Sequence, residues 1–529
     1  MKKLYFLFLL AFLPLLANAD RVEIDGIYYN LNAENHTAEV TIKPGGYMEA
    51  SAFSNYSGDM VIPETVTYEE VTYNVTSIGV RAISGCDVKS VVIPNSVITI
   101  GDNVFEQSRQ LISVTIGNSV TSIGGNAFQD CSALTSITIP KSVTSIGDEI
   151  LLRCSALTSI VVESENPNYD SRDNCNALIE TASNTLINGC KNTVIPNGVK
   201  VIAGSAFSYC SSLTSVTIPN SVTSIGNRAF IGCSGLTSVA IPNSVTSIGE
   251  SAFWECVGMT SLGLGSGLTT IGSNAFYGCS GFTSVTIPAS VLSIGEGALA
   301  GCIGLQSIQV ESGNTKYDSR NNCNAIIETA NNNLIIGCNK SVIPSSVTSI
   351  GKDAFKGCNE LTSVTIASGI TSIGEGAFSG CSGLASIVVE VGNPIYDSRN
   401  NCNAIIETAS GVLLAGCKNT IIPDGVKTIG KNAISGCKDL TSISIPNSVT
   451  TIEQSAFSGC GLTSVTIPNS VNSIGKYAFQ SCGSLSSLSI GINVTTINEC
   501  AFDDCSSLTS ITIPNSVATI GSEAFYNCI

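Results

Sequence analysis

The sequence predicts a mostly-β or α/β repeat solenoid, in which short coils of chain stack directly on one another. The stretch from Val222 to Ser244 is a 23-residue motif, and most of the chain consists of copies of it. Each copy joins an alternating apolar stretch to turns marked by proline or glycine. Aligned on the isoleucine of Val-Thr-Ser-Ile-Gly, sixteen copies follow one another; most are 23 residues apart, while two steps are 22 and three are 56. A fixed period of this length is typical of one supersecondary unit stacked on itself. The alignment isoleucines are Ile78, Ile100, Ile123, Ile146, Ile202, Ile225, Ile248, Ile271, Ile294, Ile350, Ile373, Ile429, Ile452, Ile474, Ile497 and Ile520.

Each coil contains one predicted strand. In the motif, Leu236, Val239 and Ile241 alternate with polar or small residues and are followed by a proline. β-Branched residues with a period of two are typical of a short strand that has one buried face. The apolar members are therefore expected to face a core, and the residues between them the opposite side.

The rest of the coil is predicted to return the chain to its next strand. A Pro-Asn-Ser turn follows the strand, and Val222 with Ile225 then makes a second, shorter extended contact. Gly226 is expected to permit a bend that a Cβ would hinder. Ala229 and Phe230 are expected to plug the core from a helical or 3₁₀ turn. One coil cannot bury these apolar residues alone, but stacked coils can.

The pattern Leu-x-x-Val-x-Ile-Pro, followed by Val-x-x-Ile-Gly-x-x-Ala-Phe-x-Gly-Cys, resembles the BspA-like (Treponema pallidum type) leucine-rich repeat. The resemblance covers about residues 57–529. It implies a curved leucine-rich-repeat stack of right-handed coils. It also implies a bacterial surface or secreted protein that binds host or neighbouring-cell proteins, although repeat scaffolds carry many functions.

Residues 1–19 are predicted to be a secretory signal peptide. Two lysines precede an apolar run, residues 4–16, and Ala-Asn-Ala at 17–19 fits a small-residue cleavage site. The run is too short to span a membrane, and no later stretch has about twenty uninterrupted apolar residues. We therefore expect a mature chain from Asp20 that is secreted or at the cell surface, with no membrane span and no recognisable lipid or sorting anchor.

Residues 20–74 are predicted to form a β-rich N-terminal cap. Alternating stretches at 22–25 and 38–42 are separated by Asn and Gly, which is typical of β-hairpins, and residues 67–73 predict another hairpin. A solenoid needs its first core face covered, which favours a cap; a separate adhesive domain is the alternative. Residues 75–529 are then the leucine-rich-repeat solenoid.

Three coils are predicted to be enlarged, near residues 163–198, 311–346 and 390–425. Each lies in one of the 56-residue steps, and the three segments are nearly identical. In each, two apolar runs flank a polar turn, which is a hairpin signal. The segment ends in Val-Ile-Pro or Ile-Ile-Pro, like an ordinary strand. We therefore expect an extra coil that contributes its own strand, rather than a loop outside the sheet.

The 22 cysteines invite a disulfide interpretation, because the chain is expected to be exported. Fifteen of them, from Cys86 to Cys528, lie eight residues after the alignment isoleucine, once per coil, and Ser108 takes this place in the second coil. A repeated column is expected to be a buried ladder of small thiols, since pairing neighbours would break the uniform stacking. Cys500 falls outside the column and is a candidate for exposure.

The six other cysteines form three pairs, each fifteen residues apart and flanking a hairpin turn. Two interpretations stay open for them: a disulfide across the strands, or core positions equivalent to the strand leucine. The pairs are Cys175/Cys190, Cys323/Cys338 and Cys402/Cys417.

Charge and composition argue against several classes of function. The net charge is −16 with 12% charged residues, which argues against nucleic-acid binding, since that needs clustered Lys and Arg. His36 is the only histidine and no Cys-x-x-Cys occurs. Neither a His-based catalytic triad in the repeats nor a zinc site is therefore expected. We expect no enzyme activity and no cofactor.

The exposed faces of the strands carry Thr and Ser repeatedly, with almost no charge. Thr suits an exposed strand by propensity alone; the functional alternative is a recognition surface along the solenoid. Gln306 and Gln309 interrupt the pattern on the strand before an enlarged coil, where a specific site is expected. The hydroxyl candidates are Thr214, Ser215, Thr217, Thr362, Ser363 and Thr365.

Anchor residues of specific recognition are enriched in Tyr and Arg, and these two residue types recur together in the enlarged coils. The alternative, which we favour, is that each Tyr packs the enlarged coil onto the solenoid and each Arg pairs with a neighbouring Asp. The candidates are Tyr169 with Arg172, Tyr317 with Arg320, and Tyr396 with Arg399.

These observations predict an exported, non-enzymatic protein that binds an extracellular protein or glycan, for example as a surface adhesin. The alternative is a structural surface protein whose repeats self-associate.

Overall fold

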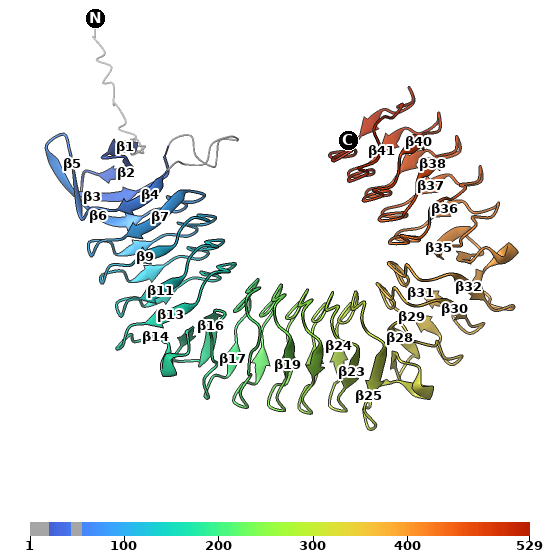
Figure 1. Ribbon diagram of the computed structural model, residues 1–529, viewed down its shortest axis with the longest axis horizontal. Coiled ribbons are helices and arrows are strands. Elements are labelled where there is room, and N and C mark those ends of the chain that lie inside the picture. The colour runs from blue at the N-terminus through green and yellow to red at the C-terminus, as the bar shows by residue number, and fades with distance from the viewer. Residues whose placement is uncertain (1–20, 44–55, 529) are drawn as a thin grey trace, which may run out of the picture. The chain divides into compact units, whose positions relative to one another are not determined.

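The computed structural model describes residues 21–43 and 56–528. The chain divides into two compact units, one up to Asp170 and one from Ser171 onward. In each unit, coils built almost entirely from strands and turns lie side by side (Figure 1). The predicted solenoid is confirmed, and of the two classes it is mostly β. The predicted signal peptide, residues 1–19, lies outside the described residues.

The first unit begins with the hairpins that the sequence predicts. β1 (Arg21–Ile24) and β2 (Ile27–Asn32) pair antiparallel, and β2 pairs antiparallel with β3 (Thr37–Val40). β3 pairs in parallel with β6 (Val71–Ile78), which forms a further hairpin with β5 (Thr65–Tyr68). Because β6 ends at the first alignment isoleucine, the hairpins join directly onto the first coil.

Two kinds of parallel strand continue through this unit. The two-residue strands at the alignment isoleucines are β8 (Thr99–Ile100), β10 (Ser122–Ile123) and β12 (Ser145–Ile146), which extend the sheet of β6. The longer strands are β4 (Ser57–Val61), β7 (Asp87–Val92) and β9 (Ser113–Thr115) in one sheet, and β11 (Ser136–Ile139) with β13 (Ser159–Val162) in another. β14 (Tyr169–Asp170) is the last strand of the unit.

The second unit repeats the same two kinds of strand. The two-residue strands are β17 (Val201–Ile202), β18 (Ser224–Ile225), β20 (Ser247–Ile248), β22 (Thr270–Ile271), β24 (Ser293–Ile294), β29 (Ser349–Ile350), β31 (Ser372–Ile373), β36 (Thr428–Ile429), β37 (Thr451–Ile452), β39 (Ser473–Ile474), β41 (Thr496–Ile497) and β42 (Thr519–Ile520). The longer strands pair in parallel as β19 (Ser238–Ala240) with β21 (Ser261–Gly263), β23 (Ser284–Ile287) with β25 (Ser307–Val310), β30 (Ser363–Ile366) with β32 (Ser386–Val389), and β38 (Ser464–Thr466) with β40 (Ser487–Ser489).

The long ladders are made by the two-residue strands, whereas the longer strands of this unit pair only two at a time. In these ladders, the glycine that follows most of the alignment isoleucines allows neighbouring coils to lie close together. A Cβ on Gly226 would lie 2.5 Å from the backbone nitrogen of Gly204 in the preceding coil. Gly226 therefore permits a close approach of two coils, rather than the bend that the sequence suggested.

The turn that carries Ala229 and Phe230, called the plug turn below, also differs from the predicted helical or 3₁₀ turn. Residues 227–232 form consecutive turns, because Arg228 and Gly232 adopt left-handed φ angles of 57° and 67°. Positive φ recurs three and seven residues after every alignment isoleucine. Alternate amides of the turn donate to the next coil, as Phe230 N does to Ala252 O at 2.7 Å.

Ala229 and Phe230 plug the core as predicted, and both are fully buried. The Phe230 ring stacks between Phe207 and Phe253, with centroid separations of 4.8 and 5.0 Å. Each coil thus completes the burial of its neighbours, which is why no coil is stable alone.

The cysteine column forms a ladder of free thiols that are almost all buried. Most of these thiols donate to the carbonyl of the residue that plugs the core one coil earlier, as Cys256 Sγ does to Phe230 O at 3.2 Å. Burial raises the pKa of the Cys302 thiol in this column to about 12. Ser108 keeps the pattern, since its hydroxyl donates to Ile83 O at 2.8 Å.

The expectation that Cys500 is exposed is wrong. It is 6% exposed, and its Sγ lies 3.7 Å from Glu523 Oε2 of the next coil. Cys500 occupies the left-handed position three residues after Ile497, where the next coil covers it.

The enlarged coils confirm the prediction of an extra coil with its own strand. In the second one, β26 (Tyr317–Asp318), β27 (Ile326–Glu328) and β28 (Asn333–Ile336) form an antiparallel meander, with a short 3₁₀ turn η2 (Arg320–Asn322) after β26. β28 then pairs in parallel with β29 and so continues the ladder. The other copies contain η1 (Arg172–Asn174), β15 (Ala177–Glu180) and β16 (Thr185–Gly189), and β33 (Tyr396–Asp397), η3 (Arg399–Asn401), β34 (Ala404–Glu407) and β35 (Val412–Gly416).

The second and third enlarged coils have no plug turn between those of the flanking repeats, which bond to each other directly. Gly301 N donates to Lys356 O at 2.9 Å, and Gly380 N donates to Ser435 O at 2.7 Å. An enlarged coil therefore separates the longer strands before and after it without separating the plug turns.

Candidate ligand-binding surface

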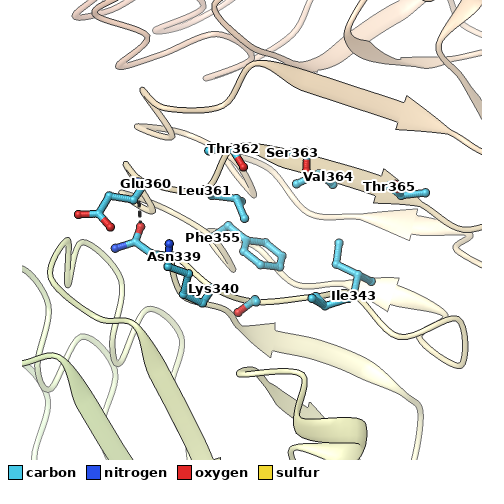
Figure 2. Close-up of a pocket in the computed structure, with 12 residues that line it drawn as sticks. Asn339, Lys340, Ile343, Phe355, Glu360, Leu361, Thr362, Ser363, Val364 and Thr365 are labelled. Carbon is cyan, nitrogen blue, oxygen red and sulfur yellow. Dashed lines mark hydrogen bonds between the residues drawn. The ribbon is translucent and has the colours of Figure 1, made fainter.

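A pocket of about 300 Å³ lies between the second enlarged coil and the repeat that follows it (Figure 2). One wall is the end of the enlarged coil, residues 339–343, and the opposite wall is residues 360–365, which include most of β30. The ring of Phe355 lies between the two walls. The predicted hydroxyl residues in the lining are Thr362, Ser363 and Thr365.

Asn339 holds this arrangement together from a buried position. Its Nδ2 donates to Ile303 O at 2.8 Å, and its Oδ1 accepts from Glu360 N at 3.0 Å, the bond drawn in Figure 2. The side chain of Glu360 in turn accepts from Gln306 Nε2 at 2.9 Å. The structure therefore connects the predicted Gln306 to the pocket, through a residue that the sequence did not single out.

The second enlarged coil differs from its two copies at this point. Lys191 and Lys418 stand where the second copy has Asn339, and Lys418 Nζ lies 3.7 Å from the carboxylate of Asp439. This exchange of lysine for asparagine is the signal that could have distinguished the second copy from the others. Nothing in the repeat pattern indicated the roles of Phe355 and Glu360 in the pocket.

Phe355 packs against the backbone of the enlarged coil. A Cβ on Gly337 would lie 2.2 Å from the Phe355 ring, so only glycine leaves the ring its place. The fully buried ring lies at the base of the pocket, between walls that combine polar residues with Val342, Ile343, Leu361 and Val364.

The hydroxyl of Thr362 differs from the equivalent hydroxyls of ordinary coils. In ordinary coils, the hydroxyls of Thr237 and Thr260 donate to the carbonyls of Thr214 and Thr237, at 3.1 and 3.2 Å. The Thr362 hydroxyl has no such acceptor within residues 21–43 and 56–528, because the enlarged coil places no equivalent carbonyl beside it.

The remaining polar candidates are exposed but lie outside the pocket lining. Gln309 is exposed on β25. Thr214, Ser215 and Thr217 follow the first enlarged coil as Thr362 follows the second, in a segment that is not a strand.

The three candidate tyrosines are buried, and they occupy equivalent positions. Each hydroxyl accepts a hydrogen bond from the backbone amide of the alignment isoleucine 23 residues earlier, at 3.1 Å in all three copies. Burial raises the pKa of the Tyr317 phenol. This placement corresponds to the alternative in which each tyrosine packs its enlarged coil onto the solenoid. No tyrosine lines the pocket. The residues are Tyr169, Tyr317 and Tyr396.

The candidate arginines donate to side chains of their own coil. Arg320 Nε and Nη2 donate to the carboxylate of Asp318 at 2.8 and 2.7 Å, and Nη1 donates to Asn332 Oδ1 at 2.7 Å. The side-chain hydrogen bond with Asp318 raises the pKa of Arg320. Arg399 pairs with Asp397 in the same way, and Arg172 Nη1 donates to Asn184 Oδ1 at 2.9 Å.

The paired cysteines of the enlarged coils are buried free thiols in the structure. Cys323 Sγ donates to Ala325 O at 3.7 Å and Cys338 Sγ donates to Asn324 O at 3.2 Å, so the two thiols point to different carbonyls. The other two pairs, Cys175/Cys190 and Cys402/Cys417, repeat these bonds.

Within the described ranges, no three His, Cys, Asp or Glu side chains gather as a metal site would require. The same residues include no helix with the length and apolar content needed to cross a bilayer.

A family model of the BspA type leucine-rich-repeat region matches residues 47–178, 200–327, 324–405 and 414–529, in six copies. The chain belongs to this family. BspA-type proteins are leucine-rich-repeat surface proteins, and their repeat regions mediate protein interactions, which is consistent with a binding role. The fold is generally a non-enzymatic one.

Several solved bacterial structures resemble the chain at low identity. A leucine-rich cell surface protein from Faecalibacterium prausnitzii is 24% identical, over 95% of this chain and 94% of that one, with a TM-score of 0.32. A leucine-rich-repeat protein from Bacteroides ovatus is 24% identical over 96% and 92%, with a TM-score of 0.36. The T. pallidum leucine-rich-repeat protein is 21% identical over 54% and 90%, with a TM-score of 0.24. No curated protein matches the chain significantly. The assignment to the family rests on the family model.

Proposed function

We propose that this chain is an exported, non-enzymatic binding protein that recognises an extracellular protein or glycan at the pocket beside β30. The observation that carries the proposal is the pocket itself, whose lining combines apolar residues with the exposed hydroxyl residues Thr362, Ser363 and Thr365. Ligand sites commonly combine an apolar concavity with a few polar groups. The charge pattern of residues 1–19 supports export.

The ordinary coils support the same proposal in a different way. They repeat similar exposed Thr and Ser residues, so they add contact area but little discrimination between ligands. The enlarged coil interrupts this regularity, because it places Asn339 and Gln306 against Glu360. Specificity is therefore expected at the interruption.

The test is a binding screen of residues 20–529 against extracellular-matrix proteins and a glycan array. Ser363→Trp fills the mouth of the pocket, and Ser284→Trp is its matched control, since residues 283–287 and 362–366 share the sequence Thr-Ser-Val-Thr-Ile. Both serines are exposed, so both variants are expected to fold. We expect Ser363→Trp to weaken binding by about tenfold or more, and Ser284→Trp to leave it unchanged. Equal effects of the two variants would reject the pocket. Concentration-dependent assembly without any ligand would favour the self-associating alternative.

A further inference from the structure

β30 has an edge that is open toward the pocket. β30 and β32 form a sheet of two strands, so each strand has one edge that is not hydrogen-bonded to a further strand. On the paired side, the amide of Ser386 in β32 donates to the carbonyl of Thr362 at 3.3 Å. Peptide groups alternate in direction along a strand, so those of Ser363 and Thr365 face the other edge.

At that other edge, the peptide groups of Ser363 and Thr365 have no backbone partner among the residues that the structure describes. The pocket lies along this edge, because residues 361–365 line one side and residues 339–343 the other (Figure 2). A row of unpaired amides and carbonyls is a template for pairing with another chain, and proteins usually cover such an edge.

The opposite edge of the same sheet is covered. Val389 on β32 donates its amide to the hydroxyl of Ser398 in the third enlarged coil, at 3.0 Å. Val310 on β25 donates likewise to Ser319 in the second enlarged coil, at 3.0 Å. A serine of each of these enlarged coils thus accepts a hydrogen bond from the strand that precedes the coil. The edge of β30, the strand that follows the second enlarged coil, remains open.

An ordinary coil leaves no room for an added strand. β23, whose sequence matches that of β30, lies beside β21 with Cα atoms within 8 Å. The segments that follow the other two enlarged coils, residues 214–217 and 441–444, are not strands. Of the three positions, β30 is the one that is both arranged as a strand and bordered by the pocket.

We propose that this edge is a site of β-strand addition, which receives an extended segment of a partner protein between β30 and the end of the second enlarged coil. The proposal rests on the proposed binding function and names the class of its partner. Main-chain hydrogen bonds to Ser363 and Thr365 supply the affinity, and alternate side chains of the segment face the lining formed by residues 339–343, which supplies the selectivity. A second copy of this chain is disfavoured as the occupant, because its net charge of −16 repels an identical copy.

The probe is a phage-displayed library of short random peptides, selected on residues 20–529. The decisive variant is Thr365→Pro, which removes one N–H from the open edge. The fold does not use that N–H, and proline is tolerated where an edge strand faces solvent. Thr365→Ala keeps the N–H and removes only the side chain. Thr286→Pro makes the same change at the equivalent position of β23.

We expect selected peptides to lose about tenfold or more in affinity with Thr365→Pro, the loss of one backbone hydrogen bond plus a steric clash. Thr365→Ala and Thr286→Pro are expected to retain binding. N-Methylation along a selected peptide should weaken binding at every second residue, which needs no protein variant and therefore holds even if Thr365→Pro fails to fold.

Three results would overturn strand addition: no peptide selected, equal loss with Thr365→Ala, or N-methylation without alternation. If the chain forms a dimer and Thr365→Pro dissociates that dimer, pairing between two copies replaces addition of a partner strand. If Ser363→Trp blocks an extracellular ligand but Thr365→Pro does not, strand addition fails while the proposed binding function stands.

Discussion

Phe230→Ala tests whether each coil depends on its neighbours. The Phe230 side chain is fully buried and stacks on two rings, at 4.8 and 5.0 Å. Truncation of a buried phenylalanine costs about 3–5 kcal/mol, because apolar burial is lost and a cavity remains. The upper part of that range is expected here, since two aromatic contacts disappear together.

Phe378→Ala is the matched control. Phe378 is also buried, but among the described residues it stacks only on Phe355, at 5.2 Å. One aromatic contact is worth about 1 kcal/mol. Phe378→Ala is therefore expected to cost about 1 kcal/mol less than Phe230→Ala.

Urea denaturation gives the two losses of stability, and hydrogen exchange gives their location. Because coupling in a solenoid runs between nearest neighbours, exchange should rise first in the coils of Phe207, Phe230 and Phe253. The coil of Phe479 should keep its protection. An equal rise at Phe479, or a loss below about 1 kcal/mol for Phe230→Ala, would refute the reasoning.

Three further predictions follow from single contacts. Gly337→Ala would place a Cβ 2.2 Å from the Phe355 ring, so urea denaturation should show a loss of about 1–3 kcal/mol in stability. Gly416→Ala should lose less stability, because its Cβ would meet Thr420 Oγ1 at 2.7 Å and Ile434 at 3.0 Å. A larger loss for Gly416→Ala than for Gly337→Ala would contradict this geometry. Tyr317→Phe leaves the amide of Ile294 without its acceptor at 3.1 Å, so the melting temperature should fall by an amount equivalent to about 1–3 kcal/mol. Ligand binding by the folded fraction should be unchanged. Lost binding at an unchanged melting temperature would instead favour a role of Tyr317 as a binding anchor. Burial raises the pKa of the Cys302 thiol from 9.0 to about 12, so above about pH 9 the unfolded chain loses this proton while the folded chain keeps it, and stability falls between pH 9 and pH 12. The fall should be shallower in Cys302→Ala, and identical slopes in urea titrations would count against a buried neutral thiol.

The sequence alone determined the repeating parts of this protein. Periodic spacing of Leu236, Val239 and Ile241 defines a buried face, and stacking repeats that face, so both the coil and its core columns follow from local pattern. The hairpins of the enlarged coils were predictable for the same reason, because two apolar runs around a polar turn pair with each other. The cysteine column was predictable as core because its period equals that of the coil.

Only the tertiary structure decided how neighbouring coils approach one another. Gly226 looked like a bend, but its role is set by Gly204 in another coil, which no local pattern contains. The plug turn looked helical, yet its amides bond to the next coil, because Arg228 and Gly232 adopt positive φ. The burial of Cys500 likewise depends on the coil that covers it.

The candidate site shows the same division. Thr362, Ser363 and Thr365 were predictable as exposed hydroxyl residues, since they fill the polar positions between the apolar residues of the Leu-x-x-Val-x-Ile pattern. The pocket beside them was not, because it exists only where the second enlarged coil separates two strands and Asn339 bridges Ile303 and Glu360. These residues are 21 to 57 positions apart, and their meeting is a consequence of stacking rather than of any local sequence preference. A periodic sequence specifies what each coil buries, but the irregular contacts between coils, which create a distinct surface, arise only when the coils are stacked in three dimensions.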